Sequence, residues 1–106
     1  MSFQPVVAWI LTGLLCMLAV TSGETARGAI PPNHWFGIRL RPLLRSPAAW
    51  RAGHAAAVAP ATIAFAVTLA VAVLGSFVPI SGVAIATFIA GVAWTFVRAS
   101  RAASRT

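Results

Sequence analysis

Residues 55–97 read AAAVAPATIAFAVTLAVAVLGSFVPISGVAIATFIAGVAWTFV, and this stretch contains no charged side chain. Two apolar runs within it, at about 55–76 and about 80–97, are each long enough for a helix that crosses a bilayer, which needs roughly 17 to 25 such residues. Glycine and proline punctuate the short segment between them (Gly75, Pro79 and Gly82), as is typical of a tight turn. The stretch therefore predicts an antiparallel hairpin of two membrane-spanning helices.

A third uncharged apolar run lies near the N-terminus, at about 5–21. The residues before it carry no positive charge, whereas a cleavable signal peptide has a basic head, so we expect a retained helix. The predicted fold class is therefore all-α, an integral membrane protein with three transmembrane helices and a short interfacial helix in the first loop. Residues 1–106 would form a single membrane domain, with a cytoplasmic loop at 23–54 and a basic tail at 98–106.

The composition excludes an ordinary soluble domain. Hydrophobic residues make up 59% of the chain and charged residues only 8%, against about 25% charged residues in soluble domains. Disorder is excluded as well, because it requires low hydrophobicity and high charge.

The charges predict an orientation. The sequence has eight arginines, no lysine and one acid, Glu24, and every arginine lies either between the first two apolar runs or after the third. Three spans place both regions on one side of the membrane, which the positive-inside rule makes cytoplasmic. We expect an inner (plasma) membrane protein with its N-terminus outside and its C-terminus cytoplasmic. The expected anionic partner is the lipid of the inner leaflet. Nucleic acid is not expected, because its binders carry their basic patch on a well-charged soluble domain.

Small residues recur every four positions in both helices of the predicted hairpin. Such stripes favour close helix packing in lipid, and we expect them to support a homo-oligomer or a membrane-protein partner. The stripes are Thr62, Ala66 and Ala70 in one run and Gly82, Ala86 and Ala90 in the other.

The first loop contains a helix start. Ser46 followed by Pro47 is typical of an N-cap and a first helical position. A short helix from Pro47 would continue into the second span, with Trp50 and His54 on one face. Pro60 would either kink that helix or mark its true start.

Apolar and basic residues alternate just before this helix. Such alternation suits a segment at the membrane interface, with apolar groups in the acyl boundary and guanidiniums on phosphates. The apolar members are Phe36, Ile38 and Leu40, and the basic members are Arg39, Arg41 and Arg45.

The same loop carries a family signature. The string Asn33-x-x-x-Gly37-Ile38-Arg39, followed by Ser46-x-x-x-Trp50-x-x-x-His54, resembles that of the SdpI family of small bacterial membrane proteins. The resemblance covers roughly residues 31–97. It implies a non-enzymatic binding or interaction role such as immunity against a secreted peptide toxin, or signalling through a transcriptional repressor held at the membrane.

The motif residues also have individual interpretations. Asn33 can tie down backbone groups, and Gly37 permits a left-handed backbone. Arg39 needs a partner, which could be a lipid phosphate, helix C-terminal carbonyls or Glu24, while Trp50 offers a cation–π face. Two interpretations stay open. Asn33, Gly37, Arg39, Ser46, Trp50 and His54 either lock the loop under the hairpin or form a headgroup or partner site.

Catalytic chemistry is not expected. Glu24 is the only carboxylate side chain, and a lone carboxylate cannot supply a paired acid and base. We expect no catalytic residue, no metal and no cofactor. The alternatives to an immunity or signalling role are a small accessory subunit of a larger membrane complex, such as a transporter or a lipid-linked glycan enzyme, and an anionic-lipid headgroup binder.

Overall fold

The computed structural model describes residues 4–33 and 37–106, and these residues form helices, turns and loops without strands. The helices are α1 (Gln4–Ala26), α2 (Arg41–Leu44), α3 (Pro47–Gly75) and α4 (Val83–Ser104). Within the described ranges, α1, α3 and α4 are long and apolar enough to cross a membrane. The predicted fold class, all-α with three helices able to cross a membrane, is confirmed. The short helix expected from Pro47 is the first part of α3, and α2 is a separate helix of four residues that the sequence did not predict.

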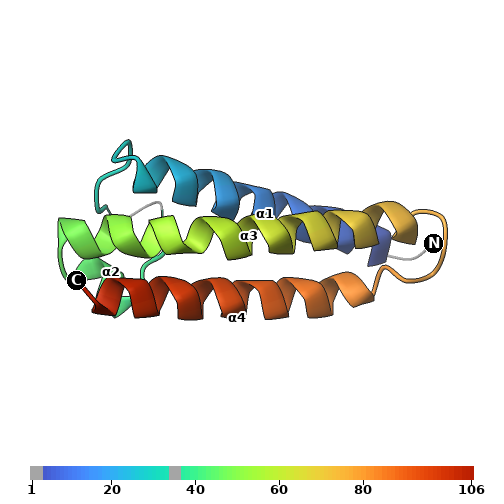
Figure 1. Ribbon diagram of the computed structural model, residues 1–106. Helices are drawn as coiled ribbons and strands as arrows, with labels where there is room; N and C mark the ends of the chain where they lie inside the picture. Colours follow the sequence, from blue (N-terminus) through green and yellow to red (C-terminus); the bar gives the residue numbers. More distant parts are fainter. Residues whose placement is uncertain (1–3, 34–36) are drawn as a thin grey trace.

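The three long helices lie side by side in an elongated bundle (Figure 1). Helix α3 packs against both α1 and α4, which make few contacts with each other. The bundle is 47 Å long, close to the roughly 40–45 Å of a bilayer with its headgroups. The α1–α3 loop and the C-terminus lie at one end, and the start of α1 and the α3–α4 turn lie at the other (Figure 1).

Helix α3 begins at the predicted position. The Ser46 hydroxyl accepts a hydrogen bond from the Ala49 amide at 3.0 Å, and Pro47 is the first helical residue. The helix then continues through Pro60, which is buried inside it. Pro60 is therefore not the start of the second span, and the helix that begins at Pro47 is the first part of that span.

Small residues bring α3 and α4 into close contact. A Cβ at Gly91 of α4 would lie only 2.4 Å from the Ala64 Cβ of α3. The hydroxyls of Thr68 and Thr87 are 2.9 Å apart and join the same two helices by a hydrogen bond. In lipid, backbone proximity and interhelical hydrogen bonds are the interactions that hold helices together.

The six small residues singled out in the sequence do not make this contact. They are all exposed in the single chain, because α3 turns a different stripe of small residues inward. The exposed residues are Thr62, Ala66, Ala70, Gly82, Ala86 and Ala90, and the buried ones on α3 include Ala57, Ala61, Ala64, Thr68 and Ala72. Packing of the exposed stripes against another chain stays a prediction.

Candidate functional site: the loop cap

His54 lies at the centre of the motif and is fully buried. Its Nε2 accepts a hydrogen bond from the Ile38 amide at 2.8 Å, and its Nδ1 lies 2.7 Å from the Trp50 carbonyl oxygen. An amide can only donate and a carbonyl can only accept, so the imidazole is neutral with its proton on Nδ1. Both ring nitrogens are therefore occupied by backbone groups.

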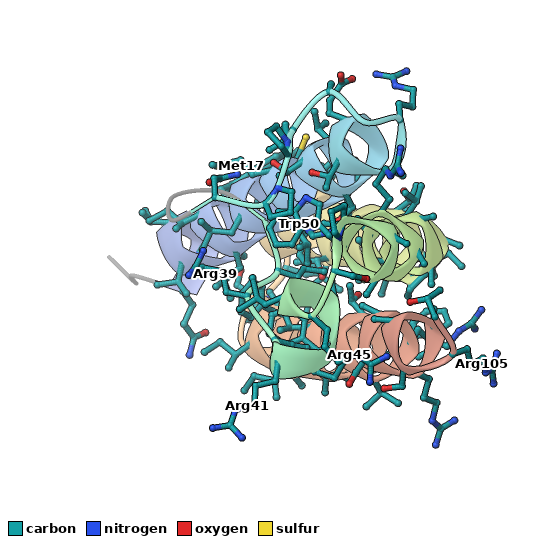
Figure 2. All side chains as sticks on the ribbon, turned by 90° about the vertical axis from the view of Figure 1, so that its left-hand side faces the viewer. Met17, Arg39, Arg41, Arg45, Trp50 and Arg105 are labelled. Atoms are coloured by element: carbon teal, nitrogen blue, oxygen red, sulfur yellow. The ribbon has the colours of Figure 1, made fainter. Side chains whose placement is uncertain are left out.

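Trp50 is buried beside His54, one helical turn earlier on α3. The two ring centroids are 4.4 Å apart, and the Trp50 indole N–H donates to the Ile30 carbonyl at 2.9 Å. Seen from the end of the bundle, Trp50 points into the space between the helices (Figure 2). The pair therefore holds two separate points of the loop, Ile30 and Ile38. We call this unit, formed by the described residues of 30–46 with Trp50 and His54, the loop cap.

Gly37 allows the loop cap to close over these rings. Its φ of +98° lies in the left-handed region, and a Cβ there would be 2.6 Å from the Trp50 ring and 2.9 Å from His54 Nε2. Both the backbone conformation and the lack of space require glycine.

Asn33 and Arg39 form a second, exposed part of the motif. The Arg39 guanidinium donates to the Asn33 carbonyl oxygen, and the Asn33 side-chain amide donates to the Pro31 carbonyl at 2.7 Å. Glu24 pairs with Arg27, not with Arg39. The aromatic contact of Trp50 is with His54, and Arg39 lies on the periphery (Figure 2). Arg39 thus remains exposed at the surface while it closes a loop of backbone.

The structure therefore divides the six motif residues between two roles. Gly37, Trp50 and His54 meet in the interior, and Ser46 caps the helix that carries two of them. Asn33 and Arg39 meet each other at the surface.

Ile38 points inward, which corrects the interface interpretation for this residue. Ile38 is only 3% exposed and packs in a cluster with Leu43, Trp50 and α4, and Leu40 packs partly against this cluster. Burial on the protein satisfies Ile38, so this side chain does not enter the acyl boundary, whereas Leu40 stays partly exposed. Phe36, the third member, lies outside the described residues.

Sequence reasoning missed two residues on which the loop cap rests. Leu43 of α2 is fully buried, and a Cβ at Gly53 of α3 would lie 2.4 Å from the Leu43 Cγ. Gly53 directly precedes His54, and a glycine inside an apolar helix next to a motif residue is a signal of close packing.

The arrangement offers little for catalysis. His54 has no free nitrogen in this conformation, and no group of three or more potential metal ligands gathers within residues 4–33 and 37–106. An open cavity of about 270 Å³ lies against the indole of Trp50. Its lining is Gly28, Ile30, Pro31, Pro32, Pro47, Trp50 and Arg51.

Comparison with known proteins supports the interpretation of the motif. Searches among curated proteins and among solved structures give no significant match. The sequence model of the SdpI/YfhL protein family matches residues 29–99, a range that contains the loop cap, α3 and most of α4. This chain therefore belongs to the SdpI/YfhL protein family.

Proposed function

We propose that this chain is a non-enzymatic binding protein of the plasma membrane, with a role in toxin immunity or in signalling. The observation that carries the proposal is the family match over residues 29–99. The motif within that range builds the loop cap, and Arg39 is the motif residue that places a cation on its surface. A closed cap with an exposed charge suits recognition of another molecule.

Binding is favoured over catalysis by the state of the ionisable groups. The only carboxylate side chain, Glu24, is paired with Arg27, and the buried imidazole of His54 is engaged at both nitrogens. General acid–base catalysis needs a group that can exchange a proton with a substrate within hydrogen-bond reach. Neither group meets this requirement in the present arrangement.

The proposed orientation places the loop cap in the cytoplasm. The loop, the start of α3 and the end of α4 share one end of the bundle (Figure 1), and they hold all eight arginines of the sequence. Positive charge favours the cytoplasmic side of a membrane. The loop cap would then act on a cytoplasmic partner or from the inner leaflet.

A challenge assay tests the immunity role. The protein is expressed in a toxin-sensitive bacterium, its membrane level is verified, and survival is measured against a panel of secreted peptide toxins. We expect protection by the wild type and its loss in Arg39→Ala. Arg41→Ala is the matched control, because Arg41 is also exposed and lies at the start of α2. Absence of protection at full expression contradicts immunity, and equal protection by both variants contradicts a role for Arg39.

A second candidate function is that of an accessory subunit. The exposed small residues of α3 and α4 favour it, together with an open hollow of about 360 Å³ between these helices. Its lining is Ile63, Ala64, Val67, Thr87, Ala90, Gly91 and Trp94. Native mass spectrometry of the protein from its own host would show a partner in fixed stoichiometry. That partner should be lost in Ala66→Leu and Ala70→Leu but kept in Val20→Leu, an exposed position on α1 with a larger native side chain.

A further inference from the structure

Three arginines outside the loop cap line one hollow at the cytoplasm-proximal end of α4. Arg98, Arg101 and Arg105, with Ala56 and Ala102, surround a space of about 410 Å³ between α3 and α4. Their spacing of three and four residues places them along one side of the helix, over about 10 Å at a rise of 1.5 Å per residue. The hollow therefore presents several guanidiniums to one bound group.

The chain holds no side-chain anion that could neutralise this hollow. Glu24, the only acidic residue of the sequence, lies on α1 and pairs with Arg27. The side chains of Arg98, Arg101 and Arg105 are all exposed, and Arg105 points away from the bundle (Figure 2). Guanidiniums recognise phosphate through paired, charge-assisted hydrogen bonds. An external phosphate is the complementary ligand.

The position along α4 favours a phosphate that belongs to a lipid. Large apolar side chains are exposed on the preceding turns of the same helix, including Ile89, Trp94 and Val97. Exposed apolar residues on a spanning helix face acyl chains, and tryptophan is common at the headgroup level. The arginines follow directly after this region, at the depth where lipid phosphates lie.

A second hollow borders the first at Arg101. This hollow has a volume of about 410 Å³ and a mostly apolar lining. The lining residues are Leu40, Phe96, Val97, Ser100 and Arg101. Arg101 thus stands between a cationic hollow and an apolar one. An amphiphile matches both surfaces, whereas a free phosphate matches only the first.

We propose that Arg98, Arg101 and Arg105 bind the headgroup phosphate of an anionic phospholipid, with an acyl chain over Phe96 and Val97. The site uses none of the motif residues of the loop cap. A test of this lipid site is therefore independent of the immunity or signalling role.

Native mass spectrometry of the purified protein tests this site. The detergent-solubilised protein is titrated with phosphatidylglycerol, cardiolipin or phosphatidylcholine, and bound lipid is counted. We expect both anionic lipids to bind and phosphatidylcholine not to. Replacement of the three arginines by glutamine (Arg98→Gln, Arg101→Gln and Arg105→Gln together) should weaken binding roughly fivefold per arginine, or about a hundredfold in total. The corresponding triple lysine variant keeps the charge and should retain most of the affinity.

A charge-matched variant distinguishes a site from diffuse attraction. Arg41→Gln, Arg45→Gln and Arg51→Gln together also remove three charges from the same end but leave the hollow intact. This variant should lose far less affinity than the α4 triple variant. Equal losses in the two variants would overturn the proposal in favour of a diffuse field. Competition by millimolar inorganic phosphate that removes all bound lipid would overturn the lipid as the source of the phosphate. Circular dichroism confirms that each variant remains helical.

Discussion

At position 37, the absence of a side chain decides whether the loop cap can close. We expect Gly37→Ala to destabilise the protein by about 1–3 kcal/mol, because the new methyl group overlaps the Trp50 ring and His54 and because alanine disfavours the left-handed backbone. Reversible unfolding in mixed micelles, followed by tryptophan fluorescence, measures this loss.

Gly13→Ala is the control for this experiment. Gly13 lies inside α1, and nothing outside its own helix lies within 4 Å of a Cβ at this position. Alanine should therefore leave stability unchanged or raise it by about 0.5–1 kcal/mol through helix propensity. A Gly37→Ala protein as stable as wild type would mean that the loop cap does not pack on Trp50 as the structure shows.

The hydrogen bonds of the buried His54 imidazole predict which ring nitrogen carries its proton. Because Nε2 accepts from the Ile38 amide and Nδ1 faces the Trp50 carbonyl, His54 should be the neutral Nδ1–H tautomer. The ¹⁵N chemical shifts of selectively labelled histidine distinguish the two tautomers and the charged form, with His34→Gln used for assignment. The Nε2–H tautomer or an imidazolium at neutral pH would contradict the hydrogen bonds to the loop.

The spacing of residues predicted part of this site. Ser46 and Pro47 indicated the start of α3, and the four-residue interval placed Trp50 and His54 on one face. The partners of these two rings are backbone groups of Ile30 and Ile38. Backbone groups have no signature in the sequence, so the contacts that close the loop cap required the structure.

At the scale of elements, the existence of the helices was predictable but their facing sides were not. The uncharged runs and the punctuated turn gave three spans and a hairpin. Helix α3, however, carries small residues around much of its circumference, so any four-residue stripe looks equally suited to packing. The observed contact requires complementary positions on two helices, such as Ala64 against Gly91, and a single helix does not reveal them.

This contact predicts a rescue by exchange. Gly91→Ala alone should destabilise the α3–α4 pair by about 1–3 kcal/mol, because its Cβ would overlap that of Ala64. The double variant Ala64→Gly and Gly91→Ala transfers the methyl group to the opposite helix and should recover most of the loss. Unfolding free energies of the four proteins form a double-mutant cycle. Additive effects would show that the two positions are not in contact.

At the scale of the whole molecule, the length of the bundle and the distribution of its arginines together predict how it lies in a bilayer. The bundle is 47 Å long, so both of its ends reach the headgroup layers of a bilayer. All arginines lie toward one of those ends, and the opposite turn between α3 and α4 exposes apolar Phe77 instead. By the positive-inside rule, this asymmetry predicts that the loop cap and the α4 hollow contact the inner leaflet.

The orientation is tested by labelling single cysteines in intact cells. In a Cys16→Ala background, which removes the only native cysteine, Phe77→Cys should react with a membrane-impermeant maleimide before lysis. Ser104→Cys, at the end of α4, should react only after lysis, because positive charge favours the cytoplasmic side of a membrane. The opposite labelling pattern would contradict this topology.

Addition of Phe77→Arg and Val78→Arg in the Ser104→Cys protein provides an internal check. These changes place positive charge at both ends and should bring part of the population into the inverted orientation. If the arginines set the orientation, part of the Ser104→Cys population will be labelled before lysis. If the apolar helices alone set the orientation, labelling will not change.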